Sequence, residues 1–306
     1  MQQKESRKAN HREEIQHIMS RKSSRKRIID RIVTSVAILC VISALIPLGS
    51  ILIEVVKNGI SAISIEFLTQ PPGSFFLGNG GIAPAIQGTL IVVGLASLIG
   101  APAGVLAGIY LSEYASNGIF PSTVRFFNDV MTGIPSIVMG IVGYVTIVLL
   151  IGSFSVWAGA LALSIIMIPI VVRVTEETFK IVPNSIREAA YSLGIPKWKI
   201  TLFITMKSAK SGIITGIVLA ISRIAGETAP LIMTILGTSL FFTGFSGPID
   251  ALPLRIWRLA SQPYESAHSQ GWGAALILIV IVLILSVALR VLVQTKSGFK
   301  PKRATF

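Results

Sequence analysis

Apolar and polar residues alternate along this chain in whole segments, not position by position. Six segments are almost entirely apolar, and each is long enough to cross the hydrocarbon core of a bilayer, which takes about 20 residues of α-helix. Polar stretches rich in Lys, Arg, Gly or Pro separate them. The pattern predicts an all-α integral membrane protein with six transmembrane helices. The predicted spans are 32–56, 83–111, 126–151, 156–172, 213–242 and 272–293.

Composition agrees with a protein that lies in lipid. The chain has 306 residues, a mean hydropathy of +0.74 and 13% charged residues, whereas a soluble domain carries about 25%. Cys40 is the single cysteine, and it lies in the first apolar run. An intramolecular disulfide is therefore excluded, and we expect no metal site.

Basic residues indicate the orientation of the spans. Most of the 27 lysines and arginines fall in the N-terminal tail (1–31), the segment 173–210 and the C-terminal tail (295–306). Lys and Arg accumulate on the cytoplasmic side of membrane proteins, so we expect both termini in the cytoplasm. The net charge of +13 then reflects topology and attraction to lipid. We expect the tail 1–31 to be a mobile, lipid-attracted arm, and we favour this over a nucleic-acid partner.

Small residues mark the expected contacts between spans. Gly100, Gly104 and Gly108 follow each other at four-residue steps, and Gly212 and Gly216 repeat that step. Such residues let helix backbones approach closely in lipid. We interpret these glycines as packing residues.

The segment 183–210 reads as a short cytoplasmic helix, a turn and a second helix. Ser185 and Glu188 have capping-box spacing, which predicts that a helix starts there. Gly194 can end that helix in the left-handed conformation, and Pro196 can open the next one. A short helix with a patch of small residues suits docking to another protein, while a solvated connector is the simpler alternative.

Glu188, Ala189, Ala190 and Gly194 resemble the EAA motif of ABC importer permeases. In that family the loop docks on a cytoplasmic ATPase. The resemblance implies a type I ABC importer permease fold for residues 80–294, with five helices and the loop 183–210. The family has a proline where this chain has Lys207, so the bend at which the family's chain turns back toward the membrane is in question here.

Longer sequence segments resemble one particular branch of this permease family. GIPSIVMGIVGY, SRIAGETAPLI and LPLRIWRLASQP are similar to the A-type (PstA) permeases of phosphate-specific ABC importers. The resemblance implies a heterodimer with a sister permease, cytoplasmic ATPases that use ATP and Mg²⁺, and an extracytoplasmic phosphate-binding protein. The amphipathic piece LRIWRLA, with Arg255 and Arg258, is a candidate docking surface for that binding protein.

Arg223 and Glu227 stand inside the fifth predicted span. Charges within a membrane are costly and usually face a bundle interior or a solute path. At a spacing of four residues, both should lie on one helix face with Thr228 beside them. Either the two residues neutralise each other and fix packing, or they line an anion pathway in which the guanidinium binds the solute. The family resemblance favours the pathway.

Thr132 and Ser136 flank Pro135 in the third span and form a second candidate group. Proline bends a helix and frees a carbonyl, and the hydroxyls could contact a solute. A kink without solute contact is the alternative interpretation.

No G-x-x-x-x-G-K-[ST] phosphate loop occurs in the sequence, so we expect no ATPase site, no catalytic residue and no cofactor on this chain. The predicted function is that of a plasma-membrane permease subunit of an ATP-driven phosphate importer. One alternative is the same machinery carrying molybdate, tungstate, sulfate or phosphonate. The other is an ion-coupled secondary carrier, a class that often shows paired repeats.

Overall fold

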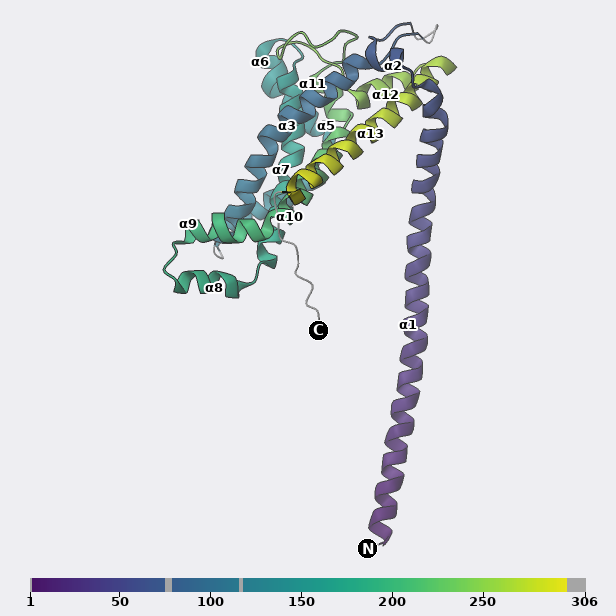
Figure 1. Cartoon of the computed structure of the whole chain (residues 1–306), viewed down its shortest axis with the longest axis vertical. Coiled ribbons are helices and arrows are strands. Elements are labelled where there is room, and N and C mark those ends of the chain that lie inside the picture. Colours follow the sequence, from purple (N-terminus) through teal and green to yellow (C-terminus); the bar gives the residue numbers. More distant parts are fainter. Residues whose placement is uncertain (1, 75–78, 116–117, 296–306) are drawn as a thin grey trace. The chain divides into compact units, whose positions relative to one another are not determined.

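The computed structural model describes residues 2–74, 79–115 and 118–295. The chain forms two compact units, Met1–Glu54 and Val55–Phe306. The first unit consists of helix α1 (Gln2–Gly59), which continues a short way into the second unit (Figure 1). Its apolar stretch lies within Ile29–Ala62, with a mean hydropathy of 2.7. Residues 2–31 have a helical backbone within α1, and the attraction of this tail to lipid stays a prediction. The predicted C-terminal tail after residue 295 lies outside the described residues.

Helices make up most of the second unit, and two isolated β-bridges are recorded among its described loops. Five helices in the described chain are long and apolar enough to cross a membrane, or up to six if the bent pair α4–α5 counts as one span. The helices are α2 (Ile65–Thr69), α3 (Ala83–Ile109), α4 (Ile119–Gly133), α5 (Ser136–Gly143), α6 (Leu149–Ile151), α7 (Val156–Ile181), α8 (Asn184–Ser192), α9 (Lys197–Lys199), α10 (Met206–Ala225), α11 (Ala229–Thr234), α12 (Leu252–Ala260) and α13 (Glu265–Thr295). One 3₁₀ turn, Ile60–Ala62, and three π-helical segments, Tyr110–Tyr114, Tyr144–Val148 and Ile200–Thr205, extend or join them.

Helix α7 lies at the centre of the second unit and packs between α3 and α10. The predicted role of the glycines is confirmed, because a Cβ atom on Gly104 would come 2.7 Å from Val171 Cβ. A Cβ atom on Gly108 would come equally close to Thr175, and one on Gly216 would come equally close to Val174. Backbone contact on both sides places a large part of α7 in the core. The core cluster includes Val92, Ala96, Leu163, Met167, Val171, Ile224 and Leu231.

Two predicted spans are broken. The third changes direction by 104° between α4 and α5, with Ile134 and Pro135 in extended backbone at the break. The predicted bend at Pro135 is therefore confirmed. The fifth span ends at Ala225, and the expectation that it continues as one helix to Phe242 is wrong. Apolar residues after Thr234 form a loop that uses positive φ at Leu236 and Gly237.

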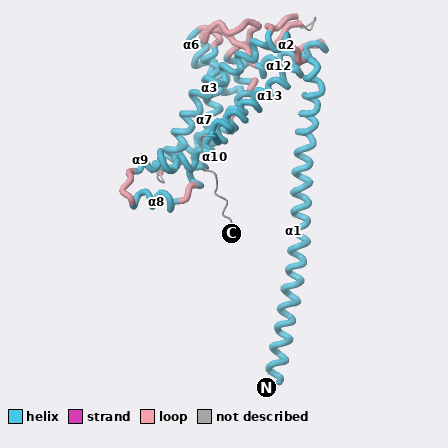
Figure 2. Tube along the Cα trace, viewed as in Figure 1, coloured by secondary structure: helices cyan, strands magenta, loops and turns pink. Residues whose placement is uncertain are grey.

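Helices α8 and α9 lie at one end of the second unit, and α2, α6 and α12 lie at the other (Figure 2). The predicted helix–turn–helix is confirmed: Gly194 has φ +74° and Pro196 precedes α9. The prediction of a capping box at Ser185 and Glu188 is wrong, because Pro183 is the N-cap and Ser185 lies inside the helix. The helical run then continues from Lys197 to Ala225, so no bend occurs at Lys207.

Candidate functional site

Broken helices enclose a small cavity halfway along α7. Its volume is about 90 Å³. Side chains from α4, α5, α7, α10 and the break before α5 converge there, so the cavity lies near the middle of the membrane-spanning bundle. The lining residues are Met131, Thr132, Ile134, Ser136, Met139, Ile166, Ile170 and Arg223. Three of them, Thr132, Ser136 and Arg223, are polar residues singled out from the sequence.

Arg223 and Glu227 form an open ion pair. Arg223 Nη2 lies 3.8 Å from Glu227 Oε1, and the side chains are 57% and 16% exposed. The expectation that both share one helix face is wrong, because α10 ends at Ala225 and Glu227 lies in the turn before α11. Within the described chain, no hydrogen bond joins the Arg223 guanidinium to another protein group, although its backbone carbonyl accepts from Gly226. Its guanidinium is therefore held near the cavity by one long contact and keeps its donors available.

Hydroxyl groups contribute unequally to the cavity. Thr132 Oγ1 donates to the carbonyl oxygen of Asp129 at 2.6 Å. Ser136 is the first residue of α5 and lies at the positive end of that helix. Thr228 precedes α11 and its carbonyl oxygen accepts from Leu231 and Ile232. Thr228 does not line the cavity, so the structure brings together all the predicted pathway residues except this one around or beside Arg223.

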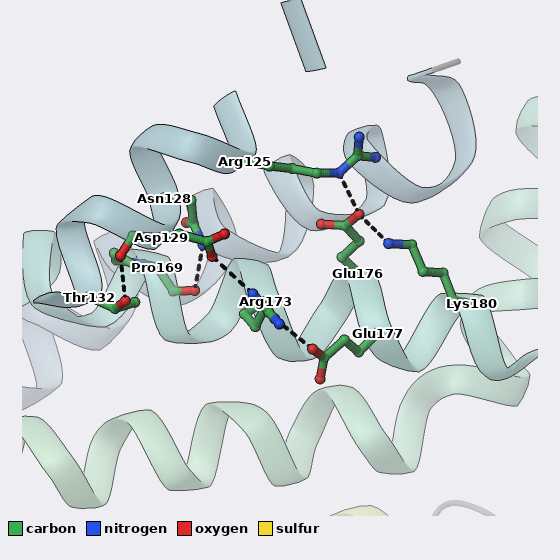
Figure 3. A network of polar contacts seen from close by, with 9 residues as sticks. All are labelled: Arg125, Asn128, Asp129, Thr132, Pro169, Arg173, Glu176, Glu177 and Lys180. Atoms are coloured by element: carbon green, nitrogen blue, oxygen red, sulfur yellow. Dashed lines mark hydrogen bonds and ion pairs between the residues drawn. The ribbon is translucent and has the colours of Figure 1, made fainter. Parts of the chain in front are cut away.

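A second group of charges joins α4 to α7 beside the cavity (Figure 3). Arg125 Nε lies 2.8 Å from Glu176 Oε1, and Lys180 Nζ lies 2.6 Å from the same oxygen. Arg173 bridges Asp129 at 2.9 Å and Glu177 at 2.5 Å. The Arg173 and Asp129 side chains remain more than half exposed. The sequence could have revealed the pairs Arg173–Glu177 and Glu176–Lys180, because each spans four residues on α7. It gives no sign of the contacts that Arg125 and Asp129 make with α7, because pairing across two helices leaves no local spacing pattern.

The EAA residues lie on α8 and the turn after it. Glu188, Ala189 and Gly194 are exposed, whereas Ala190 is buried against the rest of the chain. Glu188 and Ala189 thus belong to the outer face of α8, and Ala190 belongs to the contact that holds α8 in place.

A buried ion pair lies at the opposite end of the bundle. Arg255 Nε donates to Asp250 Oδ2 at 2.6 Å, and the side chains are 3% and 0% exposed. Burial raises the pKa of the Asp250 carboxyl above its ordinary value, although the Arg255 guanidinium acts to lower it. The interpretation of Arg255 as a surface residue for docking is therefore wrong. Its partner, five residues away in a loop, gives no helical spacing that could reveal the pair.

The chain matches known proteins over most of its length. The family described as "Binding-protein-dependent transport system inner membrane component" matches residues 100–297. A Yersinia pestis protein named phosphate transport system permease protein PstA is 42% identical over 80% of this chain and 83% of its own. A Pasteurella multocida (strain Pm70) protein of the same name is 39% identical over 88% and 95%.

Solved structures agree on the fold. A chain of a bacterial alginate ABC transporter, in complex with an alginate-bound periplasmic protein, superposes with a TM-score of 0.61 at 18% identity, covering 88% of this chain and 96% of its own. A chain of the MetNI methionine ABC transporter gives 0.55 at 17% identity, covering 70% and 94%. The fold is that of a type I ABC importer permease. The chain is a multi-pass protein of the plasma membrane and belongs to the family of binding-protein-dependent transport system inner membrane components, among its PstA permeases.

Proposed function

We propose that this chain is a membrane subunit of an ATP-driven importer of inorganic phosphate, and that the anion passes the cavity at Arg223. The carrying observation is the open guanidinium at the middle of the bundle, held by a 3.8 Å contact to Glu227 between two broken helices. Phosphate is proposed as the cargo because the PstA relatives are named as phosphate transport permeases.

An anion at this position would meet suitable chemistry. A guanidinium can give two parallel hydrogen bonds to a tetrahedral oxyanion. The first residue of α5, Ser136, adds a hydroxyl beside a helix N-terminus, which favours negative charge. Glu227 competes for Arg223 and so limits how tightly the anion is held, as transport requires release.

The exposed charges beside the cavity extend the same pathway. Asp129, Arg173 and Glu177 are each more than half exposed although they lie on membrane-spanning helices. Arg173 and Glu177 follow the predicted span 156–172 and lie on the part of α7 that leads to the α8–α9 loop. They are placed where an anion leaving Arg223 toward the cytoplasm would meet Arg173 as a second cation.

The partners follow from the same assignment. Cytoplasmic ATPases supply the energy and dock at Glu188, Ala189 and Gly194, with Ala190 supporting the helix from within. A sister permease completes the path, and an extracytoplasmic binding protein delivers phosphate. Both termini and the α8–α9 loop are cytoplasmic, and closure of the ATPases drives alternating access.

The test uses the whole transporter in proteoliposomes with ATP inside and loaded binding protein outside. Radiolabelled phosphate uptake is compared for wild type, Arg223→Gln and the control Arg290→Gln, which removes an exposed arginine from α13 that does not line the cavity. Loss of uptake in Arg223→Gln alone supports the pathway. Unchanged uptake means that the Arg223–Glu227 pair is structural.

Two further arms test the alternatives. Excess molybdate, tungstate, sulfate or phosphonate leaves phosphate uptake unchanged if the cargo is phosphate, and competition by one of them reassigns the cargo. Uptake by the purified chain alone under a proton or sodium gradient, without ATP, would overturn the ABC assignment in favour of a secondary carrier.

A further inference from the structure

Arg187, next to the EAA residues on α8, has every donor of its guanidinium engaged. Nε and Nη2 donate to Glu113 Oε1 at 3.1 and 2.7 Å. Nη1 donates to the Val182 carbonyl at 2.6 Å and to Asn184 Oδ1 at 3.1 Å. Nη2 also donates to the Phe179 carbonyl at 2.8 Å. Since a guanidinium has five N–H donors, this side chain is saturated by carbonyls at and just after the end of α7, by Asn184 of its own helix and by one residue beyond α3.

That residue lies in an unusual segment. Glu113 belongs to the π-helical turn Tyr110–Tyr114, which extends α3. The next residue, Tyr114, has the Lys197 ammonium of α9 5.0 Å from the centre of its ring. Both arms of the cytoplasmic loop, α8 through Arg187 and α9 through Lys197, therefore contact two consecutive residues of this one turn.

The same turn is bound from its other side by α4. Arg125 Nη2 donates to the Leu111 carbonyl at 2.8 Å, while its Nε pairs with Glu176 of α7 (Figure 3). One further stretch of α4 leads from Arg125 to Thr132, which lines the cavity with Arg223. A short series of charge-assisted bonds thus connects the EAA helix to the cavity.

We propose that the π-helical turn Tyr110–Tyr114 transmits movement of the EAA loop to α4 and the cavity, with Arg187 and Arg125 as the positioning residues on its two sides. This inference rests on the proposed function, because it assigns the part of the chain that couples ATPase closure to the anion site. π-helical segments in α-helices occur frequently at functional sites. The Arg187–Glu113 pair is 15% and 6% exposed, so water does not compete strongly with it and the two segments move together.

Lysine is the informative replacement at both positions. It keeps the positive charge, but its ammonium offers three donors on a flexible stem and cannot reproduce the planar fork. Arg187→Lys and Arg125→Lys should therefore leave the fold and the ion-pair charge in place while loosening the connection. Arg290→Lys is the matched control, since Arg290 is exposed on α13 and is distant from the turn in sequence.

The experiment measures phosphate uptake and ATP hydrolysis by the complete transporter in the same proteoliposomes. We expect Arg187→Lys and Arg125→Lys to keep ATPase subunits bound and to hydrolyse ATP without binding protein at the wild-type rate. The phosphate moved per ATP should fall by between about 2-fold and about 30-fold, the range for residues that carry coupling between sites. The double variant should lose no more than the worse single variant, because both residues act on one turn.

Three results would overturn the proposal. The first is an unchanged transport ratio in both lysine variants. The second is loss of the ATPase subunits from Arg187→Lys, which would make Arg187 a docking residue only. The third is a double variant whose loss is the product of the two single losses, which indicates independent structural roles. If wild type itself moves no phosphate, the proposed function fails, and that outcome is separate from all three.

Discussion

Arg255 and Arg223 are both arginines near helix ends in the same bundle, yet their surroundings are opposite. Arg255 is buried, pairs with Asp250 and also donates to the Thr238 carbonyl at 3.0 Å. Arg223 is mostly exposed and has one 3.8 Å contact. A buried guanidinium that is paired with a buried carboxylate fixes the fold, whereas an exposed one with free donors can bind something else. Exposure and hydrogen bonding separate the two roles, although hydropathy treats both residues alike.

The comparison is tested most strongly at Arg255. Arg255→Gln leaves the Asp250 carboxylate buried without its partner, which costs about 3–5 kcal/mol of folding free energy. We expect a large fall in the unfolding temperature of the purified protein in detergent, measured by tryptophan fluorescence. The double variant Asp250→Asn/Arg255→Gln should recover part of that loss, since neither charge is then unpaired. A double variant that is no better than the single one contradicts the account of a buried pair.

Arg223 should behave in the opposite way. Removing two charge-assisted hydrogen bonds to the anion, each worth about 1.5 kcal/mol, should lower phosphate uptake by Arg223→Gln about 100-fold. The unfolding temperature should stay close to wild type, because exposed substitutions change the free energy of unfolding by only about 0.5 kcal/mol. Thermal unfolding in detergent measures the unfolding temperature, and the proteoliposome assay measures phosphate uptake. A melt shifted as far as that of Arg255→Gln would mean that Arg223 is structural.

The sequence predicts those features whose cause is local. Pro135 marks the break in the third span, and Gly194 with Pro196 marks the turn of the loop, because backbone restrictions at Pro and Gly act within a few residues. The glycine steps on α3 also predict close packing, since their spacing matches the helix period.

Features that depend on distant partners could not be predicted. Apolar residues alone predict a fifth span as far as Phe242, yet the Phe242 amide donates to Gln87 Oε1 at 3.0 Å instead of continuing a helix. Glu113 gives no sign of pairing with Arg187, which is far along the chain. The sequence predicts the residues of the cavity only as two separate groups, because residues of α4 and α10 come to line one cavity only in the packed bundle.

The contrast between occupied and open surroundings extends to the backbone of α3. A Cβ atom on Gly104 would lie 2.7 Å from Val171 Cβ, whereas one on Gly94 would have no atom within 4 Å. Gly104→Ala should therefore destabilise the protein by about 1–3 kcal/mol through overpacking. Gly94→Ala should be neutral or stabilising by up to about 1 kcal/mol, since Ala is the better helix former. Equal melting temperatures for the two variants would show that α3 and α7 adjust without cost.

A smaller destabilisation than that of Gly104→Ala is expected at Gly194, where there is room for a side chain but the backbone conformation disfavours one. A Cβ atom on Gly194 would have no atom within 4 Å, yet φ is +74°. Gly194→Ala should cost about 1 kcal/mol through strain alone, and Gly194→Asn should cost less, because Asn tolerates the left-handed region. Limited proteolysis of the α8–α9 loop should reveal the difference as faster cleavage of the Ala variant. If the Ala and Asn variants are cleaved at the same rate, strain at the positive φ of Gly194 does not explain the faster cleavage. The cause is then the added side chain on the exposed surface of the loop.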